Sequence, residues 1–299
     1  MSNFITAIVQ DSEAEQSKFN NEMIMIDKKD TNGFSSHSTD HYLKKNKIID
    51  ISSASNRSFK ELKSLLNSRG IKHHERAIVS GSKVVSELVH MHPEIIEGWI
   101  MTSKGDTPTE NFPLNITCYR IKSNLFNELD VYGTRYSLLL VKVSEFLIFP
   151  EHDIPVEAVL LVPFQDPANV GAVIRSAVAF GVKGIVVLKE AAHPFHPKSI
   201  RASGTQAFKV TFMKGPSIAE LGDISRPIVA LSSDGVDINN FVFPKRFALL
   251  PGVEGPGIPE SVKPDYKVSI PMKPCVESLN ATVATSIFLY EWYKFKNNS

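Results

Sequence analysis

The chain has 299 residues, enough for two domains of ordinary size. Its hydrophobic fraction of 42% and charged fraction of 22% are close to those of soluble globular proteins, but its formal net charge is only +1. A strongly basic balance is therefore absent, so any contact with a nucleic acid has to come from a local cluster of basic residues.

The two cysteines, Cys118 and Cys275, are too few for a disulfide framework or a four-cysteine zinc site. They indicate free thiols in a reducing compartment. No apolar run approaches the roughly 18 residues that a membrane span needs. The first 20 residues carry acidic side chains but no arginine, unlike a signal or transit peptide. We therefore expect a cytoplasmic protein that does not enter the membrane.

Residues 1–47 are polar, rich in Ser, Asn, Asp and Lys, and have only short apolar islands. A segment with so little surface to bury usually stays disordered, so we expect a flexible extension. Because it has slightly more acidic than basic residues, it is not a basic arm for RNA.

Residues 48–147 alternate between short apolar runs and helical spacing, which predicts a compact α/β domain. One helix is expected over Ser58–Ser68 and a second from Ser82 to Val89. Strands are expected over residues 77–79, 97–101, 116–119 and 137–143. The stretch 148–155 contains Pro150 and Pro155 and predicts a linker.

Residues 156–299 predict a second α/β domain, with short, fully apolar strands bounded by turns. Strands of this kind are typical of a parallel sheet that is buried on both faces. The expected strands are 159–162, 184–188, 228–231, 247–250 and 267–270. Helices are expected over 170–180 and, at the end of the chain, over 279–294.

The first stretch with chemical potential is Asp166–Ala177, which follows a strand and opens a helix. Backbone amides at such a helix start bind anions readily. Asn169 is expected near the N-cap, and Arg175 follows six residues later. The alternative interpretation is an ordinary strand-turn-helix, with the asparagine as cap and the arginine in solvent.

The second stretch, Leu250–Pro259, places three glycines and three prolines around Glu254 directly after a strand. Such a sharply shaped turn exposes backbone groups to a ligand, although a tight surface turn has the same composition. No G-x-G-x-x-G sequence occurs, so the main warrant for a nicotinamide dinucleotide is missing.

The third stretch, Val268–Ala284, ends a strand at Ile-Pro-Met and places Ser278 and Asn280 at the next helix start. Both residues are good helix caps, and capping alone would explain them. The following helix carries Val283, Ile287 and Phe288 on an apolar face that is able to pack on a partner subunit.

Taken together and in this order, the three stretches resemble the signature motifs of the SpoU/TrmH family of RNA 2′-O-methyltransferases. The family patterns are N-x-G-x-x-x-R, then G-x-E-G-x-G, then I-P-M through S-L-N, and Arg201–Gly204 is similar to the family's intervening stretch. The resemblance implies a trefoil-knotted parallel-sheet domain, which is an exception to the rule against knots. It also implies S-adenosylmethionine as cofactor, a homodimer, and catalysis that needs no metal.

The resemblance also implies the site residues. The family's catalytic positions fall on Asn169, Arg175, Glu254, Ser278 and Asn280. The implied cofactor contacts are Leu231, Ser232, Gly252, Glu254, Gly255, Gly257, Ile270, Pro271, Met272 and Leu279. Family mechanisms let the arginine act as base. Because a guanidinium gives up its proton at high cost, we favour a clamp on phosphate and the 2′-oxygen.

The region before the linker is similar to the small RNA-binding domain of ribosomal-RNA members of the family, which resembles certain ribosomal proteins. This match is weaker, since Ser80-Gly81 replaces the usual Glu-Gly and residues 132–143 depart from the usual ending. The region also holds a basic cluster that we interpret as phosphate contacts rather than a solvated helix face. Its members are Arg57, Lys60, Lys63, Arg69, Lys72 and Arg76.

The sequence therefore predicts methyl transfer from S-adenosylmethionine to a ribose 2′-hydroxyl, with ribosomal RNA favoured because of the separate N-terminal domain. A tRNA 2′-O-methyltransferase is one alternative. A catalytically idle RNA-binding or ribosome-assembly relative is another, although such a protein has no need of all the catalytic residues. A dehydrogenase is disfavoured by the missing glycine pattern.

Overall fold

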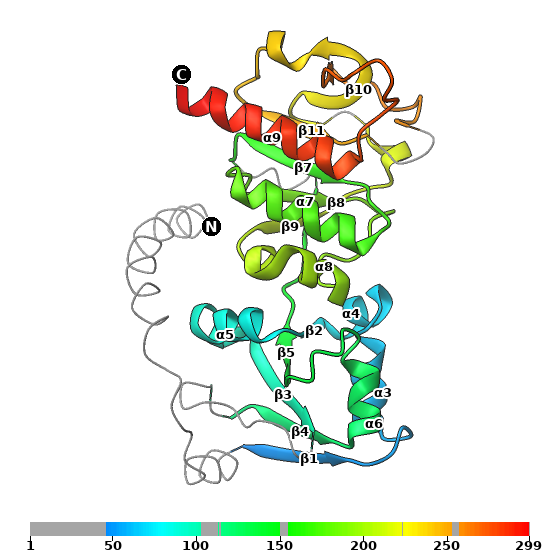
Figure 1. Ribbon diagram of the computed structural model, residues 1–299, viewed down its shortest axis with the longest axis vertical. Coiled ribbons are helices and arrows are strands. Elements are labelled where there is room, and N and C mark those ends of the chain that lie inside the picture. The colour runs from blue at the N-terminus through cyan, green and yellow to red at the C-terminus, as the bar shows by residue number, and fades with distance from the viewer. Residues whose placement is uncertain are drawn as a thin grey trace. The chain divides into compact units, whose positions relative to one another are not determined.

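Figure 1 shows a computed structural model of the chain. The structure describes residues 46–102, 113, 115–149, 155–222, 224–252 and 257–298. The predicted extension, apart from its last two residues, and most of the predicted linker lie outside these described residues. Among the helices that the structure describes, none is both long and apolar enough to cross a membrane.

The N-terminal region is built on a five-stranded sheet in the order β1-β4-β3-β5-β2. Strand β3 pairs parallel with β4, and β4 pairs parallel with β1, whereas β5 runs antiparallel to both β3 and β2. The strands are β1 Lys47–Ile51, β2 Arg76–Val79, β3 Ile96–Thr102, β4 Thr117–Ile121 and β5 Leu138–Lys142.

Alternating residues of this sheet face two different apolar clusters. Ile78, Ile100 and Leu140 lie in the cluster with helices α3 (Arg57–Ser64) and α6 (Ser123–Leu129). Their neighbours Ala77, Val79 and Trp99 lie in the cluster with α5 (Ser82–Met91). Since successive side chains of a strand point to opposite faces, helices cover both sides of the sheet.

The C-terminal region is a seven-stranded sheet in the order β12-β10-β11-β7-β8-β9-β6, and every neighbouring pair is parallel. The prediction of a buried parallel sheet is confirmed. Its strands are β6 Leu147–Ile148, β7 Ala158–Val162, β8 Gly184–Val187, β9 Thr211–Lys214, β10 Ile228–Asp237, β11 Phe247–Leu250 and β12 Tyr266–Ser269. The trefoil knot stays a prediction.

Three helices cover one face of this sheet, and Figure 1 shows them stacked one after another: α9 (Ala281–Asn298), α7 (Pro167–Ala179) and α8 (Pro197–Ser203). Helices α7 and α8 approach each other closely at Gly171. A Cβ at this position would lie 2.2 Å from the carbonyl oxygen of Ser199, so any larger residue would push the helices apart.

Several short elements were not predicted. The helix expected over Ser58–Ser68 ends already at Ser64. The side chain of Asn67 accepts from the amide of Gly70 (3.0 Å) and caps a separate helix that was not predicted, α4 (Ser68–His74). Strands β1, β6 and β9 and helices α6 and α8 were also missed, since most of them are shorter than the window over which periodicity can be counted. Strand β6 lies at the edge of the stretch expected to be a linker.

The two regions contact each other directly. The hydroxyl of Thr205 donates to Glu87 on α5 (2.8 Å), and the amide of His193 donates to the hydroxyl of Ser68 on α4 (3.2 Å). One apolar cluster also includes residues from both sheets. The N-terminal region is therefore packed on the side of the C-terminal region that carries α8.

Candidate functional site at one edge of the parallel sheet

The loops predicted to hold a cofactor gather at one edge of the seven-stranded sheet. Strand β10 pairs with β11 and with β12, so that Ala230 lies opposite Leu250 and Leu231 opposite Val268. Gly252 lies close to Leu231: a Cβ atom added at Gly252 would be 3.5 Å from the carbonyl oxygen of Leu231. Because all three strands are parallel, their carboxyl ends form a single edge, where ligands of open α/β sheets commonly bind.

The loop after Leu231 is more ordered than its sequence indicates. Strand β10 continues to Asp237 with a register shift between Leu231 and Val236, and the hydroxyl of Ser232 is hydrogen-bonded to Asp234. Lys267 donates to Asp234 (2.7 Å), and this hydrogen bond, followed by that from Ser232, lowers the pKa of Asp234 to about 2. The predicted cofactor residue Ser232 is thus oriented by a carboxylate that stays ionised.

The second loop is described only in part. Gly252 and Gly257 are half-buried, and Gly257 has φ +75°, a backbone conformation that glycine adopts without strain. Glu254 and Gly255 lie outside the described residues, so their predicted roles stay predictions.

The third loop is open to solvent. Pro271, Met272 and Ser278 are exposed, while Ile270 and Leu279 are half-buried. The side-chain oxygen of Asn280 accepts from the amides of Thr282 (2.9 Å) and Val283 (3.3 Å) and caps helix α9. The capping function expected for Asn280 is therefore present, and a contact with substrate or cofactor would be additional to it.

Helix α7 carries the first motif, but its cap differs from the prediction. The N-cap is Asp166, whose carboxylate accepts from the amide of Ala168 (2.9 Å), and Pro167 occupies the first helical position. Aspartate followed by proline is a strong helix-start signal, and it places half-buried Asn169 inside the first turn instead of near the cap.

Arg175 is exposed, and its side chain forms no hydrogen bond or ion pair with any described residue. It lies one turn after Gly171 and thus on the side of α7 that turns toward α8. Its neighbour Ser176 accepts a hydrogen bond from Ser286 of α9 (2.7 Å), which joins the helices of the first and third motifs. No residue that the structure describes therefore pairs with this guanidinium, and helix α7 is held in place by both α8 and α9.

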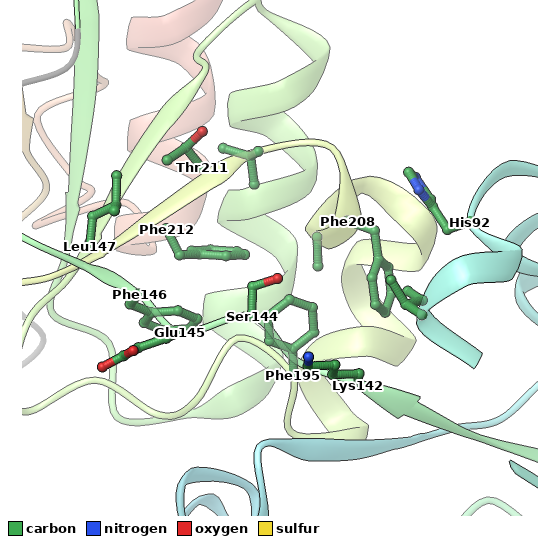
Figure 2. A pocket seen from close by; sticks show the side chains of 13 residues that line it. His92, Lys142, Ser144, Glu145, Phe146, Leu147, Phe195, Phe208, Thr211 and Phe212 are labelled. Carbon is green, nitrogen blue, oxygen red and sulfur yellow. The ribbon is translucent and has the colours of Figure 1, made fainter. Parts of the chain in front are cut away.

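A separate cavity of about 270 Å³ lies elsewhere in the molecule. Figure 2 shows its aromatic lining, which includes Phe146, Phe195, Phe208 and Phe212. The cavity opens at the amino ends of β6 and β9, whereas the predicted cofactor loops follow the carboxyl ends of β10, β11 and β12. It is therefore not part of the candidate site.

The six basic residues of the N-terminal region fall into two groups. Lys63 pairs with Glu128 (2.6 Å), and Arg76 pairs with Glu61 (2.7 Å) and Glu97 (2.5 Å). The side chains of the other four are exposed and have no ion pair or hydrogen bond to a described residue: Arg57 and Lys60 on α3, and Arg69 and Lys72 on α4. The second group is better suited to bind phosphate.

A parallel sheet with helices stacked on one face and three loops at its carboxyl edge defines an α/β domain with a ligand site at that edge. Residues 157–290 match the model of the SpoU rRNA Methylase family, so this domain is similar to the members of that family.

The chain is 44% identical over 251 residues to "Ribosomal RNA small subunit methyltransferase G 2" of Syntrophobacter fumaroxidans, covering 84% of this chain and 50% of the relative. It is 36% identical over 137 residues to "23S rRNA (uridine(2479)-2′-O)-methyltransferase" of Streptomyces viridochromogenes, covering 42% of this chain and 48% of the relative. The chain thus spans about half the length of these two curated relatives.

Among solved structures, the chain is similar to the SpoU methyltransferase AviRb from Streptomyces viridochromogenes in complex with the cofactor AdoMet. The TM-score is 0.70 at 23% identity, and the alignment covers 82% of this chain and 99% of AviRb. This similarity confirms the fold of both regions.

Proposed function

We propose that this protein transfers a methyl group from S-adenosylmethionine to a ribose 2′-hydroxyl of ribosomal RNA. The observations that carry the proposal are the exposed guanidinium of Arg175, with which no described residue pairs, and the gathering of the three predicted cofactor loops at the carboxyl ends of β10, β11 and β12. The family match and the names of the two relatives, both ribosomal-RNA methyltransferases, support it.

The residues at this edge fit an adenosyl cofactor. Buried Leu231 and half-buried Ile270 and Leu279 offer apolar surface for a base, and Gly252 leaves room for close backbone approach. Ser232, held by Asp234, offers a fixed hydroxyl. When bound, the cofactor supplies a methyl group on a positively charged sulfur, which is a good leaving group.

Arg175 would bind the substrate in this reaction. A guanidinium keeps its proton and presents a planar fork of donors, which suits a grip on phosphate and the 2′-oxygen together. While the 2′-oxygen takes up the methyl group, Arg175 would hold that oxygen and the neighbouring phosphate, and the hydroxyl proton would pass to phosphate or water. Asn169 would orient Arg175, and Glu254 would brace the second loop. Ser278 and Asn280 would contact the substrate or the methionine end of the cofactor.

We also propose a homodimer that uses α9, with a corrected contact face. Phe288, predicted on this face, is wholly buried against Phe243 and Phe247 of its own chain, and Ile287 is half-buried. The apolar residues that α9 exposes are Val283, Tyr290, Tyr293 and Phe295. Light scattering at micromolar concentration should give twice the chain mass, and a monomer would contradict the proposal.

The reaction is tested with purified protein, radiolabelled S-adenosylmethionine, and unmodified transcripts of bacterial 16S rRNA, 23S rRNA and tRNA. We expect label in ribosomal RNA and, after nuclease digestion, a 2′-O-methyl nucleoside at one position. One relative is named for the small-subunit ribosomal RNA and the other for 23S rRNA, so both 16S and 23S transcripts are tested. Label in tRNA alone would favour the tRNA alternative. Cofactor binding without transfer to any of the three would indicate an idle relative.

A further inference from the structure

The turn after α6, residues 131–136, is held in one conformation by a buried carboxylate. Asp130 is 5% exposed, and its side chain accepts from the hydroxyl of Thr134 (3.0 Å) and the amide of Arg135 (2.7 Å). The amide of Gly133 donates to the carbonyl of Asp130 (2.9 Å). Arg135 has φ +61°, which non-glycine residues rarely adopt, so the turn is built at some conformational cost.

This fixed turn presents its large side chains to solvent. Tyr136 is 53% exposed and Val131 is 49% exposed. Arg135 is also exposed and forms no ion pair or side-chain hydrogen bond within the part of the chain that the structure describes. An exposed aromatic ring can stack on an unpaired base, and an exposed guanidinium can hold a phosphate.

The same turn is anchored to the helix layer of the candidate site. The guanidinium of Arg201 on α8 lies over the ring of Tyr132, 5.0 Å from its centre. Helix α8 packs on α7 at Gly171, one turn before Arg175. Figure 1 shows α8 between α7 and the elements of the N-terminal region. The turn is thus linked to the proposed catalytic helix through a single layer of packing.

We propose that residues 131–136 bind single-stranded RNA beside the methylated nucleotide, with one base stacked on Tyr136 and a phosphate held by Arg135. This inference rests on the proposed function and concerns which RNA is selected. Sequence-specific RNA recognition commonly uses unpaired bases stacked on aromatic or arginine side chains. The residues 132–143 are also where the sequence departs from the usual pattern of the family, so a contact here would be particular to this protein.

Charge around the turn favours RNA over a protein partner. The turn contains no acidic residue, and Asp130 before it is buried and hydrogen-bonded. On α6, Glu128 is paired with Lys63 (2.6 Å), which places the turn's helix next to the helix that carries Arg57 and Lys60. An RNA strand that contacts both Arg57 and Arg135 would therefore not be repelled by an unpaired carboxylate of α6.

The test compares Tyr136→Ala, Tyr136→Phe and Arg135→Gly with the parent protein in binding of a fluorescent single-stranded RNA and of a matched duplex. Tyr136→Ala should weaken single-strand binding on the order of 10-fold, because base stacking on an aromatic ring is lost. Tyr136→Phe keeps the ring and should bind as the parent does. Arg135→Gly keeps the backbone conformation and should weaken binding with a shallower salt dependence.

Lys122→Ala is the matched control, since it removes an exposed positive charge at the other end of α6. It should leave the preference for single-stranded RNA unchanged. Equal affinity of Tyr136→Ala and the parent, or equal losses for single strand and duplex, would overturn the inference. Methyl transfer by the parent is measured in the same preparations. If transfer is present while the variants bind normally, the RNA contact is wrong and the proposed function stands.

Discussion

The two sheets of this protein place arginine in opposite situations. In the five-stranded region, Arg76 lies at the start of β2 and pairs with Glu61 of α3 and Glu97 of β3. In the seven-stranded region, Arg175 stands exposed on α7 without an ion pair or hydrogen bond to a described residue. The first arginine joins elements of the fold, whereas the donors of the second are not used by any residue that the structure describes.

The electrostatics of Arg76 support this difference. Burial by itself would lower the pKa of Arg76, but the charges and hydrogen bonds of Glu97 and Glu61 outweigh it and raise the pKa. Donors that already satisfy two carboxylates are not available to a phosphate. Of the six basic residues predicted to bind RNA, Arg76 is therefore the one that we expect to contribute most to folding and least to binding.

The largest expected effect belongs to Arg175. Arg175→Ala should lower turnover on the order of 100-fold or more, because a contact made in the transition state is lost. Arg175→Lys should be a poor substitute, since lysine keeps the charge but not the planar fork. Cofactor affinity and melting temperature should stay unchanged, because the side chain is exposed and the cofactor loops lie elsewhere. Turnover and calorimetric cofactor binding are measured on one preparation, and near-parent turnover would show that the assignment is wrong.

The sequence does not predict that Arg76 is ion-paired while the side chain of Arg175 has no partner among the described residues. Spacing and apolar runs predicted five of the seven strands of the parallel sheet but not β6 and β9. Strand β11 has the predicted bounds because turns enclose four apolar residues. The loops of the site came from motif resemblance. The partners of Arg76 lie on two other elements, so only the folded chain brings them together.

Removal of the free charges on α4 should have the next largest effect. We expect the double variant Arg69→Ala, Lys72→Ala to bind RNA on the order of 10-fold more weakly at low salt, because counterion release from two phosphates is lost. The slope of log affinity against log salt should become shallower by about two. Anisotropy titrations over a salt series measure both, and an unchanged slope would place the phosphate contacts elsewhere.

Arg76→Ala should lower the stability of the fold slightly and leave RNA binding unchanged, the opposite of what is expected for the double variant on α4. The pairs with Glu61 and Glu97 are about one-third exposed, so screening by solvent limits their loss to about 1 kcal/mol in the free energy of unfolding. RNA affinity and its salt slope should stay close to those of the parent. Urea unfolding measures the loss of stability, and the same anisotropy titration measures the salt slope. If Arg76→Ala made the salt slope as shallow as the double variant on α4 does, paired and unpaired basic residues would contribute alike to RNA binding.

The smallest effect concerns His193, which lies where the two regions meet. Its ring is buried, stacks on Phe146 (5.3 Å between centres) and accepts from the amide of Phe195 (3.2 Å). Burial, followed by the positive charges of Lys72 and His196, lowers the pKa of His193 to about 3. The ring is therefore neutral in the folded protein at pH values well above about 3.

Because the folded pKa of His193 lies below its ordinary value of 6.5, the unfolded chain takes up a proton that the folded chain does not. The stability from this ring is present above about pH 6.5 and is lost as the pH falls toward about 3. Between about pH 7 and about pH 5.5, the parent should lose about 1 kcal/mol more than His193→Asn, which keeps an acceptor but does not titrate. Urea unfolding of both proteins at the two pH values measures the difference, and equal losses would mean that another group makes the junction sensitive to acid.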